Sequence, residues 1–172
     1  MNVTGRPLER LSLAGRSIAV IGALMVVAWP VAAGLNPALL APLLPPGVAV
    51  EGALRWAALG ASLVPGVLFL GAMIEAFRLF GLLGRGEAFS TAMPRSLERL
   101  ALWALASAIA GVVTPTLIGL IATADAAEGQ RQLLIRFGSG EITGLIVALL
   151  LLAFGRVMRE AMRVARENRE FV

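Results

Sequence analysis

The chain has 172 residues, of which 58% are hydrophobic and 15% charged, and its formal net charge at pH 7 is +4. In soluble domains about a quarter of the residues are charged, so this composition indicates a membrane protein. The length predicts one domain. The sequence lacks Cys, His, Tyr and Lys. This excludes disulfides, zinc sites of the usual Cys and His types, and haem sites ligated by His, Cys or Tyr.

The missing residue types also exclude catalysis by Ser–His or Cys–His pairs or by a lysine Schiff base. We therefore expect a non-enzymatic protein with no metal and no cofactor. All fifteen basic residues are Arg, and they stand at the ends of apolar runs instead of gathering on a soluble face. This pattern is typical of membrane topology, and we expect no direct binding of nucleic acid.

Residues 17–35 are the first predicted transmembrane helix, and they follow a basic segment containing Arg6, Arg10 and Arg16. A basic segment, an apolar run and the small residues 31–34 also describe a cleaved secretory signal peptide. The apolar run is longer than the usual signal-peptide core, which favours an uncleaved first helix. The sequence leaves both alternatives open.

Residues 36–52 are predicted to form an outer loop, because four prolines interrupt helix formation there. Asn36, directly before Pro37, is placed to cap a single helical turn. The leucines of this loop are expected to rest on the outer membrane surface or on the helices. A re-entrant segment is the alternative.

The second predicted helix, residues 53–80, contains Pro65 and Gly66 near the middle of its uncharged part, which predicts a kink. A charged cytoplasmic loop, residues 81–91, connects it to the third helix, residues 92–124. In the third helix the 25 residues from Leu100 onward carry no charge, which is the longest such run in the chain. Such a run is longer than the roughly 20 residues that span a bilayer.

An outer loop is predicted over residues 125–140, with a weak strand pattern at residues 133–137. The fourth helix, residues 141–168, has only 14 uncharged residues before Arg156, a length that also fits a buried or re-entrant helix. Glu141 and Arg156 extend the usable span if their charges reach the headgroups on opposite sides. Past Arg156 the pattern predicts a helical tail.

The distribution of arginines decides the topology. With four crossings the cytoplasmic parts hold twelve arginines and the outer loops hold three. If the fourth run did not cross, the five arginines from Arg156 onward would lie outside, against the positive-inside rule. We therefore predict an all-α integral membrane protein of the inner membrane: four transmembrane helices in one antiparallel bundle, with both termini cytoplasmic.

Two stretches resemble a known family. They are Arg78-Leu79-Phe80 through Gly86-Glu87-Ala88-Phe89-Ser90 to Leu97-Glu98-Arg99-Leu100, and residues 142–172, which end in Arg166-Glu167-Asn168-Arg169-Glu170-Phe171-Val172. Together they resemble a bacterial family of four-helix inner-membrane proteins defined only as a domain of unknown function. The resemblance implies a partner, since its members are often encoded beside a helix-turn-helix regulator. It supplies no catalytic residues.

Glu75 and Arg78 are three residues apart at the inner end of the second helix. As ionisable groups near the membrane they suit a proton or ion relay, but an intrahelical ion pair at the headgroup level explains them more simply. Pro115, between two threonines, predicts a bend in the third helix, or alternatively a polar kink that lines a path.

Two functional hypotheses follow. The first is an interaction or signalling module whose cytoplasmic loop and tail engage a partner, with these candidate positions: Gly86, Phe89, Ser90, Arg159 and Asn168. The second is a small transporter or channel subunit, which would form homo-oligomers and use Glu75, Glu141 and Pro115. The lipid bilayer is the environment in both.

Overall fold

The computed structural model describes residues 5–43, 52–87, 90–122 and 138–170. Its elements, in chain order, are α1 (Gly5–Leu35), the 3-10 helix η1 (Pro37–Leu43), α2 (Gly52–Gly84), α3 (Ala92–Ala122) and α4 (Ser139–Glu170). These elements are all helical, which confirms the predicted all-α class. The strand pattern predicted at residues 133–137 lies outside the described residues.

Each of the four long helices is long and apolar enough to cross a membrane. Large apolar side chains such as Leu24, Leu63 and Phe154 are exposed on their surfaces. In water such surfaces would aggregate, whereas lipid tails solvate them. The protein is therefore a multi-pass membrane protein with four helical spans.

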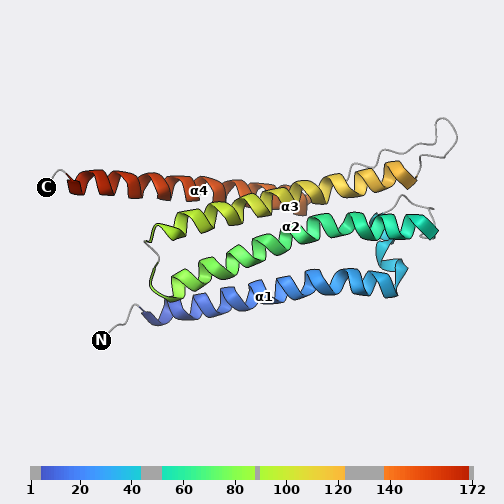
Figure 1. The fold of residues 1–172 in the computed structure, drawn as a ribbon, viewed down its shortest axis with the longest axis horizontal. Coiled ribbons are helices and arrows are strands. Elements are labelled where there is room, and N and C mark those ends of the chain that lie inside the picture. The colour runs from blue at the N-terminus through green and yellow to red at the C-terminus, as the bar shows by residue number, and fades with distance from the viewer. Residues whose placement is uncertain (1–4, 44–51, 88–89, 123–137, 171–172) are drawn as a thin grey trace.

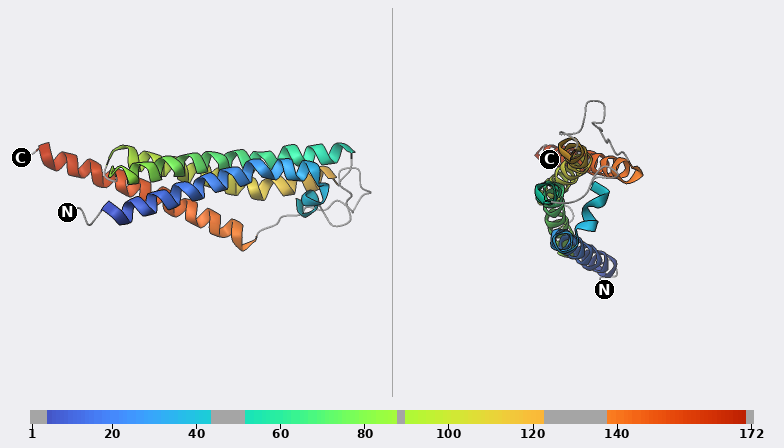
Figure 2. Two further views of the ribbon diagram at one scale, coloured as in Figure 1. Left: turned by 90° about the horizontal axis from the view of Figure 1, so that it is seen from below. Right: turned by 90° about the vertical axis from the view of Figure 1, so that its right-hand side faces the viewer.

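The four helices lie side by side and antiparallel, in the order of the chain (Figure 1). Seen along the helices, they form a curved row in which α1 packs on α2, α2 on α3, and α3 on α4 (Figure 2, right). Among the described residues α1 contacts neither α3 nor α4. The expected antiparallel bundle is thus an open row with α1 and α4 at its two edges.

Small residues make the contacts between neighbouring helices. Ala72, Ala101 and Ala148 are almost fully buried. A Cβ placed on Gly15 of α1 would come 2.5 Å from the ring of Phe80 in α2. Lipid provides no hydrophobic force between helices, so their association depends on close backbone approach of this kind.

The segment η1 closes one end of the row, on its concave side (Figure 2). The Asn36 side chain accepts a hydrogen bond from the backbone N–H of Ala38 at 3.1 Å, so the predicted cap is present. Leu40 is fully buried, in a cluster with Ala33, Ala58 and Ile118. The loop leucine thus rests on the helices and not on the outer membrane surface.

Two helix ends lie several residues from their predicted positions. The first helix begins at Gly5 instead of residue 17, so that Arg10 and Arg16 are helical, and α2 ends at Gly84 instead of residue 80. The predicted helical tail is present, since α4 continues to Glu170, and it reaches beyond the other helices (Figure 1). The structure places the two termini at the same end of the row.

Candidate functional site

The end of the row that holds both termini is rich in arginine, and we call it the charged end. The arginines there whose side chains the structure describes are Arg10, Arg16, Arg78, Arg85, Arg95, Arg99, Arg156, Arg159, Arg163 and Arg166. The opposite end holds Arg55, whose side chain donates a hydrogen bond to the carbonyl of Gly34 at the end of α1. That bond satisfies one of the carbonyls that a helix terminus leaves unpaired.

Glu75 is buried, and both of its carboxylate oxygens have a partner. Oε1 accepts a hydrogen bond from Arg78 Nη1 at 2.8 Å, and Oε2 lies 3.3 Å from the hydroxyl of Ser96. The pair with Arg78 is the one that the sequence spacing suggests. Ser96 comes from α3, and nothing in the local sequence around Glu75 could have identified it. The contact between Glu75 and Ser96 therefore links α2 to α3.

Gly86 ends α2 in a left-handed conformation, with a φ of 74°. Its N–H donates to the carbonyl of Leu83 at 3.1 Å, and the N–H of Glu87 donates to that of Leu82 at 3.0 Å. These two bonds form a Schellman cap, which favours glycine at this position because side chains disfavour positive φ. Gly86 therefore has a structural role in the turn toward α3.

The other loop candidates differ in what the structure shows of them. Phe89 lies outside the described residues. Ser90 has a buried hydroxyl without a hydrogen-bond partner among the described residues, while its backbone carbonyl accepts from the N–H of Met93 at 3.1 Å. Pro94 follows in the first turn of α3 and is fully buried. A proline is tolerated there because the first helical turn leaves its N–H groups unpaired.

Arg159 of α4 forms an ion pair with Glu98 of α3. One turn earlier the two helices come very close, because a Cβ on Gly155 would lie 2.7 Å from Cγ of Glu98. The small residue and the ion pair together hold the tail of α4 against the start of α3. In the sequence Arg159 is one cationic residue among many, and only the fold reveals its partner.

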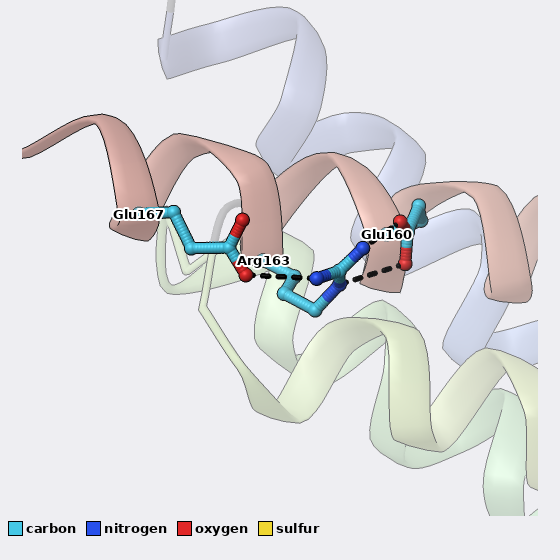
Figure 3. A network of polar contacts seen from close by, with 3 residues as sticks. All are labelled: Glu160, Arg163 and Glu167. Carbon is cyan, nitrogen blue, oxygen red and sulfur yellow. Dashed lines mark hydrogen bonds and ion pairs between the residues drawn. The ribbon is translucent and has the colours of Figure 1, made fainter.

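Further along the tail, Arg163 lies between two carboxylates on the exposed side of α4 (Figure 3). It pairs with Glu160 in the preceding turn and with Glu167 at 2.8 Å in the following turn. Such exposed pairs contribute little to stability. The three side chains together carry a formal charge of −1, so the positive charge of the tail rests on its other arginines.

The polar positions of the transport hypothesis lie apart along the row. Glu141 accepts a hydrogen bond from the N–H of Gly138 at 2.9 Å, which makes it the capping residue of α4. Pro115 lies inside α3, and the hydroxyl of Thr116 donates to the carbonyl of Val112 at 3.0 Å. Asn168 belongs to α4, but its side chain lies outside the described part of the chain.

A cavity of about 490 Å³ opens at the charged end over α2, between α1 and α3. We call it the arginine cavity. Its lining includes Arg16, Arg78, Arg85, Arg95 and Arg99, together with Glu75, Phe77 and Ser96. The sequence did not predict this cavity because its arginines come from three helices and the turn after α2, and they share no local motif.

A second hollow of about 390 Å³, the tail groove, lies between the start of α3 and the tail of α4. Its lining is Thr91, Pro94, Arg95, Arg159, Met162, Arg163, Arg166 and Glu167. Arg95 therefore lines both hollows. Among the described residues, no three side chains of the kinds that bind metals gather into one group.

Neither a curated protein nor a solved structure matches this chain. One family model does match, over residues 47–172, and its description is "Protein of unknown function (DUF2975)". The match takes in α2, α3 and α4 with the turn and the tail that suggested the resemblance, while α1 precedes it. Since most of the chain is matched, this four-helix membrane protein belongs to the DUF2975 family.

Proposed function

We propose that this protein is a non-enzymatic membrane module that binds a cytoplasmic protein through its charged end. In this proposal it lies in the bacterial inner membrane, with both termini in the cytoplasm. The support is the placement of the arginines, because loops rich in Arg and Lys stay on the cytoplasmic side. The absence of Cys, His, Tyr and Lys supports the non-enzymatic part.

The extension of α4 is the observation that carries this proposal. The last turns of α4 project beyond the other three helices (Figure 1). The four long helices have 31 to 33 residues each, so α4 projects because it is shifted along the row toward the charged end and not because it is longer. The extension is held in place by Arg159 and Glu98 and by the close contact at Gly155, so it presents a fixed surface.

Charge and shape indicate an acidic protein partner. Arg95 and Arg166 line the tail groove and have no ion-pair partner among the described residues. Met162 adds an apolar surface beside them. Complementary charge raises the rate and specificity of association, while a partly buried apolar group adds affinity. An acidic segment with an apolar anchor fits this groove.

The family resemblance suggests a helix-turn-helix regulator as the partner. Binding at the tail would hold such a regulator at the membrane. This part of the proposal rests on the resemblance, whereas the choice of surface rests on the tail groove.

Site-specific photocrosslinking in cells tests the proposal. A photoreactive residue replaces Val164 in the exposed tail or, as the control, Leu35 at the opposite end. We expect position 164 to capture one acidic cytoplasmic protein, and position 35 not to capture it. The double charge reversal Arg163→Glu and Arg166→Glu should abolish the adduct.

A matched variant separates this surface from overall charge. Arg10 and Arg156 are exposed at the same end and outside the tail groove. Their reversal to Glu changes the net charge equally and should leave the adduct in place. If both double variants lose the adduct equally, or if position 164 captures no protein that position 35 lacks, the proposed function is wrong.

A further inference from the structure

The arginine cavity shares Arg95 with the tail groove, but its other arginines lie outside that groove. Five of its lining residues are arginines, contributed by α1, α2, the turn after α2 and α3. The one carboxylate in the lining is that of Glu75. Like charges gathered around one hollow repel each other unless a negative charge offsets them. The contacts of each arginine show how much of this charge the chain offsets by itself.

Among the described residues, only one of the five arginines has a carboxylate partner. Glu75 pairs with Arg78. Arg16 stacks over the ring of Phe77, 4.2 Å from its centre, and Nε of Arg85 donates to the carbonyl of Gly81 at 3.3 Å; neither contact supplies a negative charge. Arg95 and Arg99 form no ion pair among the described residues. Four guanidinium groups at the cavity thus have no carboxylate partner among the described residues.

The cavity also lies at a particular depth. On α2 the uncharged run ends at Ile74, just before Glu75, and on α3 it begins at Leu100, just after Arg99. The arginines therefore lie where the apolar spans end, which is the level of the lipid headgroups. Their long stems favour this depth, because they keep the guanidinium groups in the polar zone.

We propose that the arginine cavity binds a phosphate group. Guanidinium is planar and donates two parallel hydrogen bonds to phosphate oxygens, so several of them around one hollow suit this anion. A volume of about 490 Å³ falls within the range of small-molecule sites. The phosphate belongs either to the headgroup of an anionic phospholipid or to a soluble phosphate compound.

Native mass spectrometry of the full chain in detergent tests this proposal, with one probe for each source. Phosphatidylglycerol represents the lipid, phosphatidylcholine is its zwitterionic control, and inorganic pyrophosphate represents the soluble anion. We expect saturable binding of one phosphatidylglycerol or one pyrophosphate per chain. If phosphatidylglycerol saturates and pyrophosphate does not, the cavity is a lipid site. If pyrophosphate saturates in the absence of lipid, the ligand is a soluble phosphate compound.

The decisive variant is Arg95→Gln with Arg99→Gln. Each charge-assisted hydrogen bond to phosphate that is lost lowers affinity by about tenfold or more. The double variant should therefore bind the probe at least about a hundredfold more weakly than the wild type. The matched control is Arg10→Gln with Arg156→Gln, which removes the same charge from the same end but outside the cavity. The affinity of this control for the probe should stay within about threefold of the wild-type affinity.

A second pair keeps the test decisive if the glutamine pair does not fold. Arg95→Lys with Arg99→Lys preserves the charge but loses the planar fork, and it should bind the probe about tenfold more weakly. Three results overturn the proposal: neither probe saturates, the control pair loses as much affinity as the cavity pair, or the lysine pair binds as tightly as the wild type. The wild-type crosslink from position 164 does not use these variants, so its outcome is independent of all three.

Discussion

The two ends of the helix row are held together in different ways. At the charged end the links are polar: Ser12 donates to the carbonyl of Phe80 at 2.6 Å, Ser96 contacts Glu75, and Arg159 pairs with Glu98. At the opposite end a cluster of apolar side chains gathers around Leu40 of η1. One end is thus joined by hydrogen bonds and ion pairs, and the other mainly by packing.

This difference shows where a polar ligand finds partners. The apolar side chains around Leu40 have no hydrogen-bonding groups to offer. Three buried polar side-chain atoms have no hydrogen-bond partner among the described residues: Nε of Arg55 lies at the packed end, whereas Oε1 of Glu98 and the hydroxyl of Ser90 lie at the charged end. Both hollows that we describe at the charged end, the arginine cavity and the tail groove, lie among its polar links. Four substitutions test the contrast.

The largest effect is expected at the packed end, from Leu40→Ala. Removing a fully buried leucine side chain costs the lost transfer energy and leaves a cavity, and such changes cost about 2–5 kcal/mol. Reversible unfolding of the protein in mixed micelles measures the loss. Leu35→Ala is the control, because Leu35 is 83% exposed, and it should change stability by less than about 0.5 kcal/mol.

The next effect is expected where α3 and α4 meet, from Gly155→Ala. The new Cβ would overlap Cγ of Glu98 and lie 3.3 Å from its backbone nitrogen, so the helices must separate. We expect a loss of about 1–3 kcal/mol in the same unfolding assay. Gly111→Ala has open space around the new methyl group and should be neutral or stabilising. Equal losses in both variants would contradict close packing at Gly155.

A smaller effect is expected from Arg159→Gln. The side chain of Glu98 is only 15% exposed, and it would keep its charge after losing its ion-pair partner. Because Arg159 itself is 59% exposed, solvent screens the pair, and we expect a loss of about 1 kcal/mol that shrinks as salt is added. Leu40→Ala should show no such salt dependence, and a matching salt response in both would remove the contrast between the ends.

The smallest effect is expected from Glu141→Ala, which removes the cap of α4. The carboxylate accepts the Gly138 N–H and also stabilises the positive end of the helix dipole, for a total of about 0.5–1 kcal/mol. Hydrogen exchange in the first turn of α4 should become faster while the rest of the helix keeps its protection. Thr143→Val, which removes the neighbouring hydroxyl but not the cap, is the comparison.

The four spans could be predicted from the sequence, because a long uncharged run bounded by arginines is typical of a helix that crosses a bilayer. The Asn36 cap and the pair of Glu75 with Arg78 could be predicted as well, since both depend on neighbours in the chain. The partners Ser96 and Glu98 could not be predicted, because each pairing joins different helices. The arginine cavity escaped prediction for the same reason.

The arrangement as a row could not be predicted either. Helix lengths and short connections predict antiparallel neighbours, but they do not say whether the first helix returns to the last. In the structure α1 and α4 are the two edges of the row. The sequence does not indicate this, because an apolar helix face has the same composition whether it contacts lipid or another helix. The early start of α1 was not predicted, since Arg10 and Arg16 resemble a polar leader.

The open row bears on what could pass through the membrane beside this protein. A row of helices encloses a pore only when its two edge helices meet. Among the described residues the edge helices α1 and α4 make no contact. The described part of one copy therefore does not enclose a pore by itself. Any conduit built from it would have to be completed by another subunit, set against the concave side or joined along the two edges.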